Sequence, residues 1–302
     1  MSLRDHIYDL RFRLTLALLC IGIGGVFGFV WWELRIGPIP SLGDLIIGPY
    51  CALPENLRFP PKPCGLLQTQ PFEAFLVRFK VGIAAGAVLT SPLWLYQIWA
   101  FIAPGLYAKE RKFARVFVGF ATTLFVAGAA LAYFVVPEGL SVLVGFGGEG
   151  FITALAADKY ISFVLVLLLI FGVSFELPLI VVMLNQAGIL PYDNLRRWRR
   201  GIIFGLVIFA ALATPGTDPI SMVALAASMT VLFELSVLIS RIHDRRKAKR
   251  EDGGEFAFEG LSDDEASPLD LSARPAEESS IIPGPTTAGK RPGAGTDYDD
   301  VT

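Results

Sequence analysis

Charge, histidine and cysteine are all scarce in this chain, which limits the chemistry that it can perform. Only 18% of its 302 residues are charged, whereas soluble domains average about 25%. The two histidines, His6 and His243, stand far from any candidate buried nucleophile. The chain contains no G-x-S-x-G, H-E-x-x-H or phosphate-binding glycine motif. We therefore expect no catalytic residue, metal or cofactor, and a protein that binds or uses an external source of energy.

Apolar residues are correspondingly abundant. They make up 53% of the chain, and the mean hydropathy is +0.56, which is typical of a polytopic membrane protein. Runs of about 20 apolar residues suit helices that cross a bilayer. We predict an all-α integral membrane protein with six transmembrane helices, at Leu14–Trp32, Val81–Ala103, Val116–Val136, Ile161–Leu184, Gly201–Ala213 and Pro219–Ser240.

The second of these helices could extend back to Pro71, and the third is expected to stop at Pro137. The fourth contains Pro178, which should loosen its backbone. The fifth is short, because 13 residues rise only about 20 Å against a hydrocarbon layer of roughly 30 Å.

The charge is divided unevenly along the chain. Residues 1–250 contain 23 Lys and Arg against 15 Asp and Glu, whereas residues 251–302 contain 3 against 13. The acidic segment is rich in Gly, Pro, Ser and Thr and lacks apolar periodicity, a composition that cannot bury a core. We therefore divide the chain into a transmembrane domain, 1–242, and a disordered tail, 243–302, that is first basic and then acidic.

Basic residues indicate the orientation. With six transmembrane helices both termini lie on one side, and that side receives 17 Lys and Arg against six on the other. The positive-inside rule places the more basic side in the cytoplasm. The four arginines at 196, 197, 199 and 200 are interpreted as topology signals and contacts to anionic lipid. A multi-pass protein of the bacterial cytoplasmic membrane, with both termini inside, is predicted.

Glu176 is the one charged residue in the apolar run 161–184. A carboxyl group in mid-membrane costs about 2.5 to 3.5 kcal/mol unless it finds a polar partner or water. One interpretation is a glutamate that is protonated and hydrogen-bonded within its own bundle. The other, which we favour, is a functional polar group that receives a substrate, an ion or a partner helix.

The three cysteines separate by location. Cys20 lies within the first transmembrane helix and is expected to be an inert packed thiol. Cys51 and Cys64 fall in the first outer loop, where oxidising conditions permit a disulfide. Such a bridge would stabilise its 14-residue loop by about 3 kcal/mol. Two free thiols are the alternative.

Four segments taken together resemble TatC, the multi-span receptor subunit of the twin-arginine protein translocase. They are DHIYDLRFRL (5–14), WAFIAPGLYAKERK (99–112), GVSFELP (172–178) and TPGTDP (214–219). The resemblance covers about residues 5–242 and leaves the acidic tail outside it. The F-I-A-P-x-L-Y-x-x-E-R pattern within the second segment is its most specific part.

The resemblance implies a cupped, six-helix bundle without enzymatic activity that exports folded proteins with the proton-motive force. It implies as partners the signal peptides with two consecutive arginines, TatA- and TatB-type single-span proteins, membrane lipids and further copies of the chain, and no nucleic acid. By motif, the signal-peptide surface would contain Glu110, Asp9, Arg11 and Phe101, the intramembrane polar site would be Glu176, and the outer motif positions would be Pro49 and Asp218.

Two positions depart from the family pattern. Asp9 stands where the family usually has a glutamate, so that its side chain is one methylene shorter. Met222 stands where a glutamine is frequent, which weakens a hydrogen-bonding role near the outer end of the sixth helix.

The residues on the predicted cytoplasmic face also have simpler interpretations. Glu110 lies among Lys109, Arg111 and Lys112 and could pair with them as an ordinary surface glutamate. A carboxylate there could equally accept a bidentate arginine fork. Asp5, Asp9 and Arg13 recur every four residues on one helix face, where ion pairs would contribute only about 0.2 to 0.5 kcal/mol.

The main alternative function is a proton-coupled secondary transporter that uses Glu176. Such folds usually contain internal repeats and helices broken in matching halves. No second copy of the glutamate segment occurs in this sequence, and we therefore favour the receptor.

Overall fold

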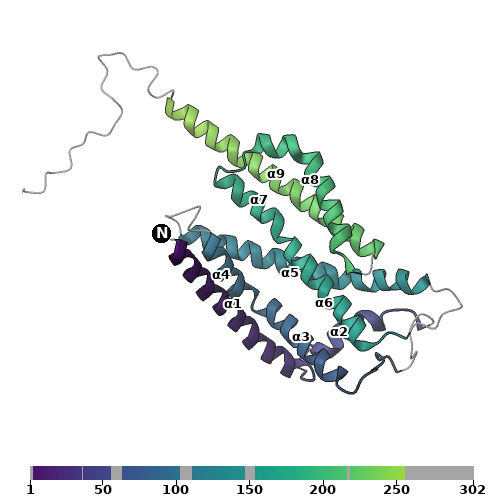
Figure 1. Cartoon of the computed structure of the whole chain (residues 1–302). Coiled ribbons are helices and arrows are strands. Elements are labelled where there is room, and N and C mark those ends of the chain that lie inside the picture. The colour runs from purple at the N-terminus through teal and green to yellow at the C-terminus, as the bar shows by residue number, and fades with distance from the viewer. Residues whose placement is uncertain are drawn as a thin grey trace, which may run out of the picture. The chain divides into compact units, whose positions relative to one another are not determined.

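The computed structural model describes residues 3–35, 37–55, 63–102, 111–146, 154–215 and 218–255. Within these residues the regular structure is α-helical, apart from an isolated bridge between Leu67 and Ala156. The helices are α1 (Leu3–Trp31), α2 (Leu42–Cys51), α3 (Glu73–Leu89), α4 (Ser91–Ile102), α5 (Arg111–Gly145), α6 (Ala157–Ser174), α7 (Glu176–Gln186), α8 (Tyr192–Ala213) and α9 (Pro219–Glu255) (Figure 1).

Met1–Lys249 form one compact unit, and residues 250–302 are separate from it. The domain boundary that we predicted at residue 242 therefore lies inside α9, which continues as a helix to Glu255. Residues 256–302, most of the tail predicted to be disordered, lie outside the described residues.

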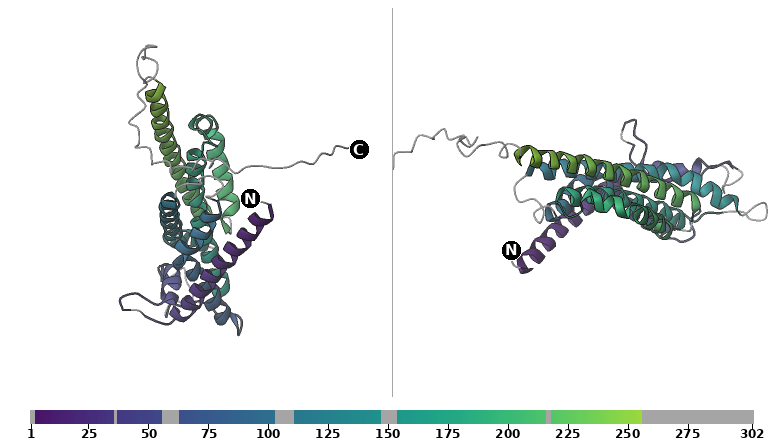
Figure 2. Two further views of the ribbon diagram at one scale, coloured as in Figure 1. Left: turned by 90° about the vertical axis from the view of Figure 1, so that its left-hand side faces the viewer. Right: turned by 90° about the horizontal axis from the view of Figure 1, so that it is seen from above.

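Helix α1 packs against α3 through glycines. Gly24 and Gly28 on α1 face Gly82 and Gly86 on α3, and a Cβ atom on Gly28 would lie only 2.6 Å from the carbonyl oxygen of Gly82. Small residues four apart let two backbones approach closely, which is how helices associate without a hydrophobic driving force. The pairing fixes α1, drawn in purple in Figure 2, obliquely along one edge of the compact unit.

The second predicted transmembrane helix is broken. Helices α3 and α4 meet at Thr90 with a bend of 63°. Thr90 caps α3, since its amide and its hydroxyl both donate to the carbonyl oxygen of Gly86. Pro92 falls in the first turn of α4, where the missing N–H group is tolerated. Helix α3 begins at Glu73, close to the earlier start that we considered at Pro71.

The prediction that the third transmembrane helix stops at Pro137 is wrong. Helix α5 contains Pro137 and continues to Gly145. Proline removes one backbone hydrogen bond but does not end a helix that neighbouring elements hold on both sides. Here α2 packs against α5, and the Tyr133 hydroxyl donates to the Leu45 carbonyl oxygen at 2.9 Å.

The fourth predicted helix divides near Pro178. Helix α6 ends at Ser174 and α7 begins at Glu176. A proline ring clashes with the carbonyl group four residues earlier, which for Pro178 is that of Ser174. The break in the backbone that we predicted at Pro178 therefore lies about one turn before this proline. The break places Glu176 at the start of a new helix.

The apolar helices agree with an integral membrane protein. Within the described residues four segments are long and apolar enough to cross a bilayer, and the bent pair α3–α4 brings the number to five. The four are His6–Trp31, Arg115–Gly145, Ala157–Gln186 and Pro219–Lys249. Helix α8, with the predicted fifth transmembrane helix in its second half, is not among them because its first half is basic. Six transmembrane helices remain a prediction.

Candidate functional site

The N-terminal turns of α1 carry the first predicted site residues. Arg13 Nε donates to both carboxylate oxygens of Asp9, at 2.9 and 2.8 Å. The intrahelical pairing that we considered is thus formed. The Asp9–Arg13 pair is partly exposed to solvent and Arg11 is exposed. A charged ligand can therefore reach the pair and Arg11. An exposed pair of this kind contributes little to stability and can be displaced.

A ring contact joins this part of α1 to the end of α4. The rings of His6 and Phe101 are stacked, with centroids 4.5 Å apart and planes inclined by 21°. Asp9 follows His6 by three residues and therefore shares its helix face. The structure brings Asp9 and Phe101 to one end of the α1–α4 pair. Glu110 lies outside the described residues, directly before α5 in the chain.

Glu176 is the first residue of α7, and its carboxyl group is buried. Both carboxyl oxygens are enclosed, and neither has a hydrogen-bond partner among the described residues. Leaving a buried polar group unpaired costs about 1 to 3 kcal/mol. The interpretation of Glu176 as a glutamate hydrogen-bonded within its own bundle finds no support in these contacts, and the described residues leave the hydrogen-bonding capacity of the carboxyl group unused.

The structure also contains an apolar cavity of about 410 Å³, which does not include Glu176. It lies between α3, α5 and α6, and residues of α2 also line it. Its lining includes Trp31, Val88, Phe125, Tyr133 and Leu168. A surface of this composition suits hydrocarbon, and it offers no charged group to a ligand.

The two motif positions predicted to lie on the outer side, Pro49 and Asp218, are both buried. Pro49 lies within α2. Asp218 is completely buried and accepts hydrogen bonds from the amides of Ile220 and Ser221, both at 3.1 Å, at the start of α9. This is helix N-capping. Gly139 of α5 lies so close that a Cβ atom there would be 2.5 Å from Asp218 Oδ2.

Cys51 and Cys64 are joined by a disulfide in the structure, with Cα atoms 5.9 Å apart. Cys51 ends α2, so the bridge ties that helix to the segment that leads to α3. Cys20 is unpaired and half-buried.

We predict that a thiol reagent applied to intact cells modifies neither Cys51 nor Cys64 until a reductant is added, because a disulfide presents no thiolate. Mass spectrometry of the labelled peptides measures this. A Cys51→Ser variant is the matched control, since it should expose Cys64 to labelling without reductant. Labelling of both residues in untreated wild-type protein would refute the bridge.

Sequence reasoning missed Glu73, which organises the end of the bundle at which α3 begins. Its buried carboxylate accepts hydrogen bonds from the amides of Thr69, Gln70 and Asp158, at 2.5, 3.0 and 2.7 Å, and from the Thr69 hydroxyl at 2.9 Å. It therefore joins the segment before α3 to the first turn of α6. A glutamate that directly precedes an apolar run and follows turn residues was the available signal.

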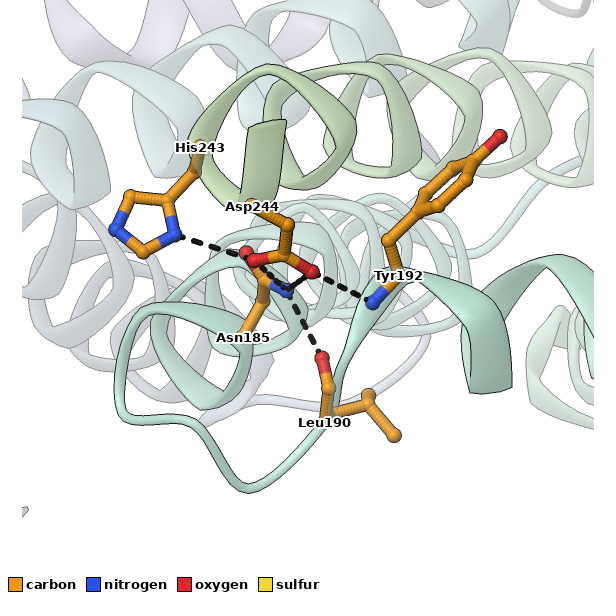
Figure 3. Close-up of polar contacts among 5 residues, drawn as sticks. All are labelled: Asn185, Leu190, Tyr192, His243 and Asp244. Atoms are coloured by element: carbon orange, nitrogen blue, oxygen red, sulfur yellow. Dashed lines mark hydrogen bonds and ion pairs between the residues drawn. The ribbon is translucent and has the colours of Figure 1, made fainter. Parts of the chain in front are cut away.

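Asp244 was also missed, because we assigned it to the tail. It lies on α9 and accepts hydrogen bonds from Asn185 Nδ2 of α7, at 3.2 Å to each carboxylate oxygen, and from the Tyr192 amide of α8 at 2.8 Å (Figure 3). His243 Nδ1 is 3.3 Å from the same carboxylate. Pro191, at the N-cap position of α8, has no side-chain acceptor, so Asp244 provides the cap from a different helix.

Comparison with known proteins identifies the family. The model of the TatC family, Sec-independent protein translocase protein (TatC), matches residues 5–227. The chain belongs to the TatC family. This is a non-enzymatic family of protein transport, so the expectation that the chain is not an enzyme is confirmed, and the transporter alternative loses its support.

Named relatives of this TatC chain come from bacteria and from a chloroplast. It is 46% identical over 294 residues to the Sec-independent protein translocase protein TatC of Corynebacterium kroppenstedtii, covering 92% of this chain and 70% of that protein. It is 37% identical over 239 residues to the chloroplastic protein of Pisum sativum, covering 77% of this chain and 62% of that protein.

A solved structure supports the same assignment. The crystal structure of the twin arginine translocase receptor TatC in DDM superposes with a TM-score of 0.64 and 29% sequence identity, covering 78% of this chain and 99% of that one. The all-α membrane fold predicted from sequence is thereby confirmed, and this TatC chain is a membrane component of the Tat translocase.

Proposed function

We propose that this chain is the receptor for twin-arginine signal peptides in its membrane and that the receptor surface lies where α1 begins and α4 ends. The stacking of His6 on Phe101 supports this most directly, because it gathers the predicted residues of two motifs, Asp9 and Phe101, at one end of the molecule. The α4–α5 connection, which contains Glu110, starts from that same end.

The chemistry of recognition rests on carboxylates. An arginine guanidinium is planar and always charged, and it binds a carboxylate through two parallel hydrogen bonds. In this proposal Glu110 binds one arginine of the peptide, and Asp9 exchanges its intrahelical partner Arg13 for the other. That exchange costs little, because such pairs contribute only about 0.2 to 0.5 kcal/mol.

Binding of a fluorescent signal peptide to the purified protein in detergent tests this function. A peptide with two consecutive arginines should bind, and its twin-lysine counterpart should bind weakly, because an ammonium group cannot form the bidentate fork. Measurements at two salt concentrations separate specific binding from nonspecific attraction. Equal affinity for both peptides would refute recognition of the arginine pair.

Glu176 is proposed as the contact for a polar group on a partner helix, of the TatA or TatB type. Its two carboxyl oxygens are buried and unpaired among the described residues, so a donor on a second helix would remove the cost of burial. The complex is proposed to contain further copies of this chain, to contact membrane lipids, and to use the proton-motive force for export across the bacterial cytoplasmic membrane with both termini in the cytoplasm.

We expect Glu176→Ala to weaken crosslinking to such a partner more than Glu176→Gln does, because glutamine keeps hydrogen bonding and alanine removes it. Site-specific crosslinking in membranes, normalised to the amount of each variant, measures the difference. If both variants crosslinked to the partner as strongly as the wild type, the role of Glu176 would be purely structural.

A further inference from the structure

An ion pair joins α3 to α6 close to the ends at which both helices begin. Lys80 Nζ of α3 is 2.5 Å from Asp158 Oδ1 and 3.3 Å from Ser162 Oγ, both on α6. The side chains of Lys80 and Asp158 are 44% and 38% exposed. We call Lys80, Asp158 and Ser162 the Lys80 cluster. A pair as exposed as this one is weakly held and can exchange its partners.

Helical spacing places the Lys80 cluster at one end of the apolar cavity. On α3, Lys80 lies one turn before Ala84, on the same helix face, and Ala84 lines the cavity. On α6, Ser162 lies one turn before Leu165 and two turns before Leu169, which also line it. The two lining faces therefore continue into the Lys80 cluster, so that one amphipathic molecule can contact the apolar cavity and the charged pair together.

This end of the cavity has the composition of a membrane interface. Trp31, which lines the cavity, and Trp32 lie at the end of α1, and the guanidinium of Arg78 is 5.8 Å from the centre of the Trp32 ring. Tryptophan gathers where hydrocarbon meets lipid head groups. The Lys80 cluster therefore lies near the depth of the head groups, and the cavity extends from it toward the middle of the bilayer.

The size of the cavity matches a fatty acyl chain. An apolar cavity of about 150 Å³ takes benzene, with its six carbons, so 410 Å³ corresponds in proportion to about 16 carbons. A helix about 10 to 12 Å across fills roughly 420 to 610 Å³ in each turn. A partner helix of several turns does not fit inside this cavity, whereas one chain of a lipid does.

We propose that the cavity and the Lys80 cluster bind one zwitterionic aminophospholipid, such as phosphatidylethanolamine. One acyl chain occupies the cavity. The lipid phosphate accepts hydrogen bonds from the Lys80 ammonium and the Ser162 hydroxyl, and the lipid ammonium replaces Lys80 as the partner of Asp158. Both charges of the pair then keep an opposite charge. An anionic lipid without an amine would satisfy Lys80 but leave Asp158 facing the phosphate.

Native mass spectrometry of the full-length protein in detergent tests the head-group site. The protein is titrated with phosphatidylethanolamine or with phosphatidylglycerol of identical acyl chains. We expect one bound phosphatidylethanolamine and several-fold weaker binding of phosphatidylglycerol. Lys80→Met removes the ammonium and nearly keeps the length of the side chain. This variant should bind phosphatidylethanolamine several-fold more weakly than the wild type does.

Lys159→Met is the matched control for the lost charge. Lys159 is exposed and follows Asp158 on α6, but successive residues of a helix point about 100° apart. Its side chain therefore leaves the face that carries Asp158 and Ser162. This variant should bind phosphatidylethanolamine with wild-type affinity.

A phosphatidylethanolamine with a photoactivatable diazirine in the middle of one acyl chain tests the cavity, with the protein in lipid nanodiscs. Crosslinks should map to the lining segments of α3, α5 and α6. Ala84→Phe places an aromatic ring in the cavity and should reduce these crosslinks several-fold. Val231→Phe, at a residue of α9 that is 60% exposed and outside the lining, should leave them unchanged.

Three results would each overturn the proposal. They are equal affinity for the two lipids, wild-type binding of phosphatidylethanolamine by Lys80→Met, and undiminished crosslinking to the lining in Ala84→Phe. The lipid titration stands even if Ala84→Phe fails to fold, because the side chain of Lys80 is partly exposed and its replacement leaves the packed core unchanged.

Discussion

Glu110→Gln should weaken binding of a twin-arginine signal peptide by about 2 to 5 kcal/mol, on the order of thirtyfold or more in Kd. Glutamine keeps the shape of the side chain but loses the negative charge and one of the two acceptors of the arginine fork. The loss should be smaller where water reaches the site. Fluorescence titration of labelled peptide with the detergent-solubilised variant measures it.

Two further variants serve as controls, because each should weaken peptide binding less than Glu110→Gln does. Glu110→Asp should bind with intermediate affinity, because it keeps the charge and loses the bidentate geometry. Asp9→Ala should do less damage, since Asp9 is already one methylene short and is paired with Arg13. If Glu110→Gln bound with wild-type affinity, and the twin-lysine peptide bound equally well, this segment would not recognise the arginines.

Gly86→Ala should destabilise the protein through the α1–α3 contact. A Cβ atom on Gly86 would collide with the backbone of Gly24 and Gly25, and backbone atoms cannot move aside as a flexible side chain can. Overpacking of this kind costs typically about 1 to 3 kcal/mol and sometimes more. Thermal unfolding of the purified protein, followed by circular dichroism, measures the loss as a lower Tm.

Gly22→Ala is the matched control for this effect. Gly22 lies in α1, and nothing lies within 4 Å of the position of an added Cβ. Alanine also has a higher helix propensity than glycine, by about 1 kcal/mol, so this variant should be neutral or slightly stabilising. An equal loss of Tm in the two variants would show that the close contact of α1 with α3 does not determine the result.

Much of the architecture was predictable because the bilayer imposes strong constraints on sequence. A chain that crosses hydrocarbon must satisfy its backbone within helices and present apolar side chains over a fixed length. The all-α membrane class and the approximate positions of α1, α5, α6 and α9 follow from these constraints. The motifs around Phe101 and Glu176 were sufficient to suggest the TatC family, which the comparisons then confirmed.

Helix ends and breaks were predicted less well, because a proline in an apolar run does not always interrupt the helix. Pro137 lies inside α5, whereas Pro178 coincides with the break between α6 and α7. The difference depends on what surrounds the helix: α2 packs beside α5 near Pro137. No local pattern contains that information.

The sequence by itself determined the class, the family and the identity of Glu176 as an unusual intramembrane acid. Only the tertiary structure placed Asp9 at one end of the molecule with Phe101, and only it revealed Glu73 and Asp244 as acceptors for amides of distant segments. The physical reason is the range of each interaction. Hydrophobic length and motif spacing are properties of neighbouring residues, whereas a hydrogen bond between residues 52 or 85 positions apart exists only once the helices have packed.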